Sequence, residues 1–201
     1  MNSVVYTLGH STHPIERLID LLKSNTITAV CDVRSSPYSR VNPQFNRESL
    51  RETLRTCGIK YVFLGKELGA RTTDRSCYSN GKVQYDRLAR TELFQNGLQR
   101  VLKGAELYRI SLLCAEKDPI FCHRMVLISP CLAERGVAIR HILGNGAVET
   151  QDGAAERLLQ RFRISDRDLF RPREDALAEA MRRQAETIAY EEDTDLTRRD
   201  S

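Results

Sequence analysis

The chain has 201 residues, of which 41% are hydrophobic, and its formal net charge is +4. This length and composition suit one domain with a real core, which should fold without disulfides. No window holds the roughly 18 apolar residues that a membrane span needs, and the N-terminus lacks signal-peptide features, so we expect a cytoplasmic protein without membrane contact. The small net charge does not by itself indicate a nucleic-acid binder.

Apolar strands alternate with amphipathic helices along the first 150 residues. The apolar runs predict strands at about residues 4–8, 27–33, 59–64, 110–114 and 137–142. Helical spacing predicts helices between them, at about residues 14–22, 47–57, 85–103 and 121–135. Because the connections are short, we expect an α/β fold with a Rossmann-like sheet of about five parallel strands and helices on both faces.

Three segments depart from this alternation. Residues 65–84 are polar and lack periodicity, which is typical of a functional or disordered loop. Pro130 falls inside the last of these helices, where proline costs about 3 kcal/mol, so we expect an irregular helix there. After the α/β domain at 1–150, we expect residues 151–201 to form a helical extension with a break at Pro172, followed by a charged tail. These helices are expected to pack against the core or against a second copy, which would give a homodimer.

Polar side chains follow the predicted strands at the points where the strands end. In parallel α/β sheets, ligands bind outside the carboxyl ends of the strands. His10, Asp32 and Glu116 each follow a different strand, and we therefore expect them at one edge of the sheet. Two of them also have a structural alternative: Gly9-His10-Ser11 suits a tight turn with a helix cap, and Asp32 suits a salt bridge to Arg34 or a loop cap.

Arginines and aromatic residues are interleaved between residues 34 and 55. Arginine next to an aromatic ring suits phosphate contact combined with base stacking, and four residues of the predicted loop fit this pattern: Arg34, Tyr38, Arg40 and Phe45. The arginines of the following helix recur at helical spacing together with acidic residues, which is more typical of a solvated helix face: Arg47, Arg51 and Arg55 with Glu48 and Glu52.

The densest group of reactive side chains comprises Cys114, Glu116, Cys122, His123 and Arg124. As the rim of an active site, it would supply a carboxylate, a thiol, a proton donor and an anion clamp. Zinc binding is disfavoured, because the two cysteines lack the spacing of a zinc finger and neighbouring helical residues point about 100° apart. We therefore expect no metal and no cofactor. A redox pair of thiols and simple packing remain as alternatives.

Several motifs together resemble one protein family. TLGHS, CDVRSSPYSR with Phe45, GIKYVFLGKELGAR, LLCAEKDPIFCHR and VAIRHI occur in order over residues 4–143, and they resemble the domain-of-unknown-function family 488. The chain has Gly69-Ala70-Arg71 where the family usually has Gly-Gly-Arg. The resemblance implies a bacterial α/β protein without an established activity. Its motif positions are His10, Ser11, Asp32, Arg34, Pro37, Ser39, Arg40, Gly69, Arg71, Glu116, Cys122, His123 and Arg124.

Two hypotheses of function follow. The first is an enzyme acting on a nucleotide or on a base in nucleic acid, which hydrolyses or transfers a glycosidic bond by carboxylate and histidine chemistry, as in DNA repair. Its candidate catalytic residues are Glu116, Asp32, His10, His123 and Cys122. Its candidate substrate-binding residues are Ser11, Arg34, Tyr38, Ser39, Arg40, Phe45, Arg71 and Arg124. The second is a non-catalytic module that binds nucleic acid or a phosphorylated ligand and uses cysteine and histidine only for packing.

Overall fold

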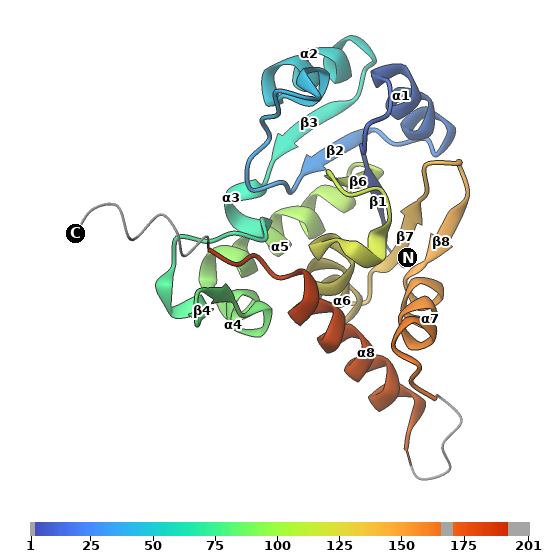
Figure 1. Ribbon diagram of the computed structural model, residues 1–201. Coiled ribbons are helices and arrows are strands. Elements are labelled where there is room, and N and C mark those ends of the chain that lie inside the picture. Colours follow the sequence, from blue (N-terminus) through green and yellow to red (C-terminus); the bar gives the residue numbers. More distant parts are fainter. Residues whose placement is uncertain (1–2, 166–170, 193–201) are drawn as a thin grey trace, which may run out of the picture.

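The computed structural model describes residues 3–165 and 171–192 (Figure 1). Over these ranges, the central sheet has six strands in the order β3-β2-β6-β1-β7-β8. Their bounds are β1 Val4–Gly9, β2 Ala29–Asp32, β3 Lys60–Phe63, β6 Ile110–Cys114, β7 Ala138–Ile142 and β8 Val148–Thr150. The first five pair in parallel, whereas β8 runs antiparallel to β7. The predicted α/β fold is confirmed, with one extra strand that is too short to show a pattern of its own.

Helices cover both faces of the sheet, as the sequence predicts (Figure 1). On one face, α1 (Ile15–Ser24) and α2 (Arg47–Thr56) bury leucines against strand residues such as Leu8 and Leu113. On the other face, α5 (Glu92–Ala105) and α6 (Ser129–Ala133) pack on Leu112 and its neighbours. The sheet thus separates two hydrophobic clusters, because successive strand residues point to opposite faces.

The segment between β3 and β6 contains more structure than its sequence suggests. Residues 65–84 hold the short helix α3 (Gly65–Leu68), a 3-10 turn and the hairpin strands β4 (Tyr78–Ser79) and β5 (Lys82–Val83). The single helix predicted at 85–103 is two helices, α4 (Tyr85–Arg90) and α5. They are separated at Thr91, whose side chain accepts a hydrogen bond from the backbone of Phe94 and caps α5.

The helix predicted at residues 121–135 is wrong in its first half. A 3-10 turn occupies Pro119–Phe121, Cys122 is extended with φ −134° and ψ 141°, and a π-helical turn spans Arg124–Ile128 before α6 begins. Proline lacks an N–H group, so Pro130 is tolerated in the first turn of a helix and not in its interior. The irregularity expected near Pro130 is thus present as the π-helical turn that precedes α6.

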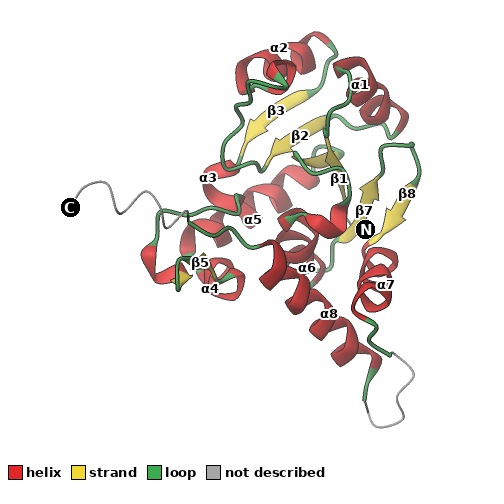
Figure 2. Cartoon of the chain, in the orientation of Figure 1, coloured by secondary structure: helices red, strands yellow, loops and turns green. Residues whose placement is uncertain are grey.

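The C-terminal helices α7 (Gln151–Phe162) and α8 (Arg173–Ile188) lie side by side (Figure 2), and Pro172 forms the N-cap of α8. Buried residues of both helices, including Leu158 and Ala180, join the hydrophobic cluster of the α5 and α6 face. The C-terminal helices are expected to pack either against the core or against a second copy, and the structure shows them packed against the core. Within the described ranges, no helix is both long and apolar enough to cross a membrane.

Candidate active site

The ends of three neighbouring strands bring the predicted site residues to one edge of the sheet. Strand β6 lies between β1 and β2, and its pairing extends beyond the strand ends: the His10 amide donates to the Cys114 carbonyl at 2.9 Å. Gly9 permits this close approach, because a Cβ atom at that position would lie 1.7 Å from the Glu116 carbonyl oxygen. Only glycine fits there without a backbone shift.

The alternation of side chains divides this edge into two groups. We use the term Arg34 network for His10, Asp32, Arg34, Phe45 and Tyr61, which lie on the α1 and α2 face. We use the term thiol cluster for Cys114, Glu116, Cys122 and His123, whose cysteines belong to the opposite face. A hydrogen bond of 3.2 Å from His123 Nε2 to the Val33 carbonyl links the two groups.

A buried ion pair forms the centre of the Arg34 network. The Arg34 guanidinium donates to both carboxylate oxygens of Asp32, at 2.9 and 2.6 Å, and also to the Phe45 carbonyl at 2.9 Å. Asp32 accepts two further hydrogen bonds, from the Arg34 amide and from the Tyr61 hydroxyl. Because a carboxylate has about four acceptor sites, Asp32 has none left for a substrate. The salt bridge between Asp32 and Arg34, considered above as the structural alternative, is thus present.

His10 is held as a neutral imidazole beside this pair. Its Nε2 lies 3.1 Å from Arg34 Nη1 and its Nδ1 lies 2.8 Å from the Ser11 carbonyl, which assigns the proton to Nδ1. The ring stacks on Phe45 at 4.3 Å. Burial, supported by the nearby Arg34 charge, lowers the pKa of His10 to about 4. Ser11 adopts a left-handed backbone with φ 51°, which turns its carbonyl toward the ring.

The thiol cluster brings together one potential ligand atom from each of its four residues. The sulfur, nitrogen and carboxylate oxygen atoms of its four residues all lie within 4.8 Å of one another. His123 Nδ1 is 3.7 Å from the Cys114 sulfur and 3.8 Å from the Cys122 sulfur. Cys114, Cys122 and His123 are buried, whereas Glu116 is exposed. The cluster therefore has a dry interior and one carboxylate that solvent and ligands can reach.

Burial and mutual contact perturb every titrating group of this cluster. Burial alone would raise the pKa of Cys122, but the hydrogen bond from Cys114 and the charges of Arg124 and His123 lower it well below its ordinary value. The same hydrogen bond raises the pKa of Cys114. Protein packed around the Glu116 carboxyl, together with the charge of Cys122, raises the pKa of Glu116, although its side chain reaches the surface. Such shifts are frequent at functional sites.

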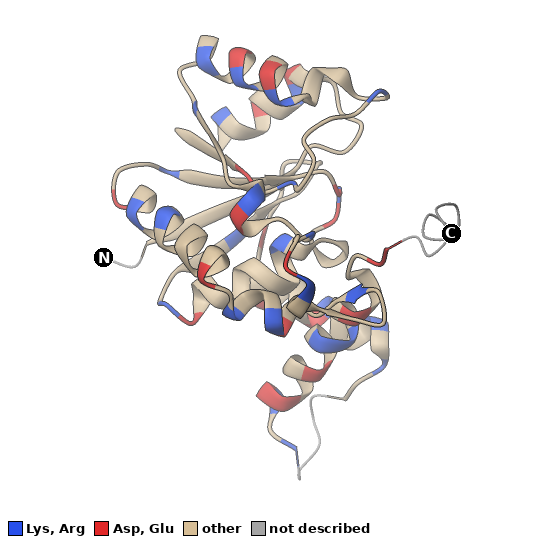
Figure 3. Ribbon diagram, turned by 90° about the vertical axis from the view of Figure 1, so that its left-hand side faces the viewer, with Lys and Arg blue, Asp and Glu red and all other residues tan. Residues whose placement is uncertain are grey.

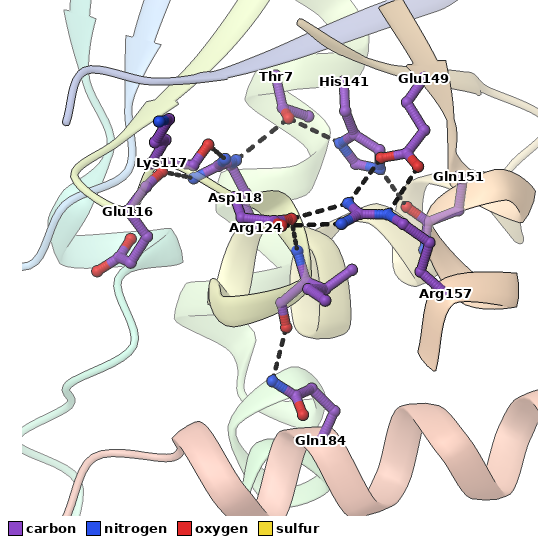
Figure 4. Close-up of polar contacts among 11 residues, drawn as sticks. Thr7, Glu116, Lys117, Asp118, Arg124, His141, Glu149, Gln151, Arg157 and Gln184 are labelled. Atoms are coloured by element: carbon purple, nitrogen blue, oxygen red, sulfur yellow. Dashed lines mark hydrogen bonds and ion pairs between the residues drawn. The ribbon is translucent and has the colours of Figure 1, made fainter. Parts of the chain in front are cut away.

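Arg124 organises the loop that carries the cluster (Figure 4). It is completely buried, and it donates to the Glu116 carbonyl at 2.8 Å and to the Thr7 hydroxyl at 3.3 Å. Thr7 in turn contacts His141 at 2.8 Å, and the other ring nitrogen of His141 contacts Gln151 at 2.9 Å. Arg124 therefore holds the backbone of this loop, and neither Arg124 nor His141 faces solvent.

The C-terminal helices support the same loop (Figure 4). Arg157 of α7 donates to both carboxylate oxygens of Asp118 at 2.8 Å and also pairs with Glu149. Gln184 of α8 is buried and donates to the Ile120 carbonyl at 2.8 Å. Asp118 and Ile120 lie between Glu116 and Cys122, so the extension fixes the segment that connects two cluster residues.

The other predicted substrate-binding residues lie outside both groups. Tyr38 is 60% exposed and donates to Glu48, and Arg40 is exposed. The Ser39 hydroxyl accepts backbone hydrogen bonds within its own loop, and the Arg71 guanidinium lies over the Tyr190 ring at 4.3 Å. In the ribbon of Figure 3, positions of lysine and arginine alternate with positions of acidic residues along the helices.

Two tyrosines near the site carry no signal in the sequence. Tyr61 follows the alternation of β3 and donates to Asp32 at 2.7 Å. Burial raises the pKa of Tyr85, and the charges of Cys122, Cys114 and Glu116 raise it further, so its phenol interacts electrostatically with the thiol cluster.

Tyr85 also lines a mainly apolar groove of about 700 Å³ between α4 and α8. No member of the thiol cluster lines that groove, so we do not place the site there.

Comparison with known proteins identifies the family. Residues 14–130 match the family described as domain of unknown function DUF488, and this range covers more than half of the chain. The chain belongs to the DUF488 family. The DUF488 match includes Asp32, Arg34 and the whole thiol cluster, whereas His10 precedes it and the C-terminal helices follow it. Searches of curated proteins and of solved structures each return no significant match.

Proposed function

We propose that this protein is an enzyme that acts on a nucleotide, or on a base in nucleic acid, and that Glu116 is its proton-transferring residue. The position of Glu116 carries this proposal. It is an exposed carboxylate beside two buried thiols and an imidazole, at the carboxyl end of a strand that is flanked on both sides. Parallel α/β sheets place their ligands at this edge.

Hydrolysis or transfer of a glycosidic bond suits this arrangement. Glu116 takes a proton from the attacking water or acceptor hydroxyl as the new bond to the sugar carbon forms. The bond to the base breaks with its electrons remaining on the base, and Glu116 then returns the proton to the base. Asp32 has no free acceptor site, so we assign it to holding Arg34 in place and not to proton transfer.

The loop after β2 supports the choice of a nucleotide substrate. It exposes Tyr38 and Arg40, an aromatic ring and a cation that suit base stacking and phosphate contact. This loop leaves the sheet at Val33, whose carbonyl accepts the hydrogen bond from His123. The start of this loop therefore lies next to the thiol cluster. The free cysteines suit the reducing cytosol, where we place the reaction.

One observation favours a second candidate, a non-catalytic module that binds nucleic acid or a phosphorylated ligand. Cys114, Cys122 and His123 are only 3%, 1% and 6% exposed, as residues with a packing role would be. The two candidates differ in whether a bound ligand is chemically changed.

The test is to incubate the purified protein with nucleosides, nucleotides and single- and double-stranded oligonucleotides, and to detect released bases by mass spectrometry. We expect base release by the wild type and a rate about 10²- to 10⁴-fold lower for Glu116→Gln, the range typical of acid–base catalysis. Glu106→Gln is the matched control, because Glu106 is exposed near the start of β6, at the opposite end of the strand. Binding without any chemical change would favour the binding module. Equal rates for wild type and Glu116→Gln would remove the proposed mechanism.

A further inference from the structure

The spacing of the thiol cluster is that of ligands around a metal ion. With zinc-to-sulfur and zinc-to-nitrogen bonds of about 2.3 and 2.0 Å, tetrahedral geometry places a sulfur and a nitrogen ligand about 3.5 Å apart. His123 Nδ1 lies 3.7 and 3.8 Å from the two sulfurs. Nδ1 makes a directed hydrogen bond with one sulfur at a time, whichever of the two atoms carries the proton. The nearly equal distances are better explained by a common partner that all three atoms face.

The hydrogen bonds around the cluster also match those around metal ligands. Histidines that bind a metal usually donate their other ring N–H to a carbonyl or carboxylate. His123 places Nε2 3.2 Å from the Val33 carbonyl, so Nδ1 is the ring nitrogen that is directed at the sulfurs. The Cys122 sulfur accepts the backbone N–H of Arg124 at 3.5 Å, so it too is oriented by the protein.

The local backbone explains how adjacent residues bind at one point. The sequence disfavours zinc only if Cys122 and His123 follow each other on a helix. Cys122 is instead extended and His123 is helical, with φ −59° and ψ −24°, so the helical divergence of about 100° does not apply. Cys114 reaches the same point from the end of β6. A strand end and an irregular turn thus bring these side chains together without the short cysteine spacings of a zinc finger.

We propose that Cys114, Cys122 and His123 bind a zinc ion and that Glu116 stands beside an open fourth position. Two thiolates and an imidazole select zinc over the harder magnesium and calcium ions, which prefer oxygen ligands. Three protein ligands with one open position are typical of catalytic zinc, whereas structural zinc has four. Glu116 is the exposed member of the cluster, so the open position faces solvent.

The binding of zinc is independent of the proposed function, but the role of the open position rests on it. Zinc lowers the pKa of a bound water molecule to about 7, and a neighbouring carboxylate can accept the proton that the water loses. Glu116 would then be the proton acceptor of the proposed reaction, with the attacking water held at the metal. Glu116 is needed for this step and not for retention of the metal.

The experiment is elemental analysis of the full chain, produced without an affinity tag that binds metals and purified under reducing conditions. We expect one zinc ion per chain in the wild type. Cys114→Ser and Cys122→Ser should lose the zinc, whereas Glu116→Gln should retain it. Cys131→Ser is the matched control, because Cys131 is a half-buried thiol on α6 outside the cluster.

Cobalt(II) exchange keeps the proposal testable if a cysteine variant does not fold. In the wild type, cobalt should give the intense visible bands of a tetrahedral site and the thiolate charge-transfer bands of two cysteines. Absence of both zinc and a cobalt spectrum would overturn the proposal, as would equal zinc loss in Cys131→Ser. Iron or copper in place of zinc would overturn the identity of the metal. A disulfide between Cys114 and Cys122 in freshly purified protein would favour a redox pair instead.

The two proposals fail in different ways. Zinc binding together with equal base release by wild type and Glu116→Gln would leave the metal site and remove the proposed function. Base release that depends on Glu116 in a protein without zinc would do the reverse.

Discussion

The Arg34 network and the thiol cluster lie at the same edge of one sheet, yet they satisfy their polar atoms in opposite ways. In the Arg34 network, each acceptor of Asp32 and both ring nitrogens of His10 have a protein partner. In the thiol cluster, the lone pairs of sulfur, nitrogen and oxygen face one another. The first arrangement is complete without a ligand, whereas the second needs protons or a cation to be stable.

This contrast separates two roles that the sequence could not distinguish. A buried polar network with every member satisfied makes the structure rigid, and it resists change. Lone pairs that face one another in a buried site cost free energy unless one of the atoms is protonated or the atoms bind a cation. Such groups occur at functional sites. We therefore expect substitutions in the Arg34 network to act on stability and substitutions in the thiol cluster to act on chemistry.

The largest effect is expected from Asp32→Asn. The substitution removes the charge that balances Arg34, whose side chain is only 7% exposed, and removal of one partner from a buried pair typically costs about 3–5 kcal/mol. Urea unfolding followed by circular dichroism would measure this loss. Asp20→Asn on the exposed face of α1 is the matched control and should change stability by less than about 0.5 kcal/mol. A comparably small change for Asp32→Asn would show that the network does not stabilise the fold.

The next effect is an acid-dependent loss of stability caused by His10. Its pKa is about 4 in the folded chain and 6.5 in the unfolded chain, so between these values only the unfolded chain binds the proton. The free energy of unfolding should therefore decrease as the pH falls from 6.5 to 4, by about 3 kcal/mol for this group, and show no contribution from it above pH 6.5.

His10→Gln isolates this contribution. Its amide can accept from Arg34 and donate to the Ser11 carbonyl without titrating. His141, whose pKa burial also lowers to about 4, remains in both proteins and cancels in the comparison. Parallel pH profiles of the free energy of unfolding for His10→Gln and the wild type would contradict the assignment of His10 as a neutral acceptor.

A smaller effect is expected from Tyr61→Phe. The substitution removes one hydrogen bond of 2.7 Å to the buried Asp32 carboxylate and leaves the ring in place. Hydrogen bonds to charged groups contribute about 1.5–3 kcal/mol, and the half-buried position of Tyr61 favours the lower end. Chemical denaturation gives the value. In a double-mutant cycle with Asp32→Asn, the two losses should not add, because Asp32→Asn removes the charge that strengthens the hydrogen bond from Tyr61.

The fold could be predicted from the sequence more fully than the site. Apolar runs and short connections identify five of the strands, and topology places His10, Asp32 and Glu116 at the same edge. The division of that edge into two faces depends on the register of the strands, which cannot be predicted from the loop sequences. The extended backbone of Cys122 depends on tertiary contacts, and Tyr61 lies in a strand where a hydroxyl has no distinguishing pattern.

The smallest effect on stability is expected from Glu116→Gln, which makes the same chemical change as Asp32→Asn in the other group. The Glu116 side chain is exposed, and Arg124 anchors the loop through the Glu116 backbone carbonyl, which the substitution leaves intact. We therefore expect a change of less than about 0.5 kcal/mol in urea unfolding, together with the roughly 10²- to 10⁴-fold slower base release described above. A loss of stability similar to that of Asp32→Asn would mean that the Glu116 carboxylate holds the loop. The thiol cluster would then be a structural element like the Arg34 network, and its carboxylate would no longer be available for proton transfer.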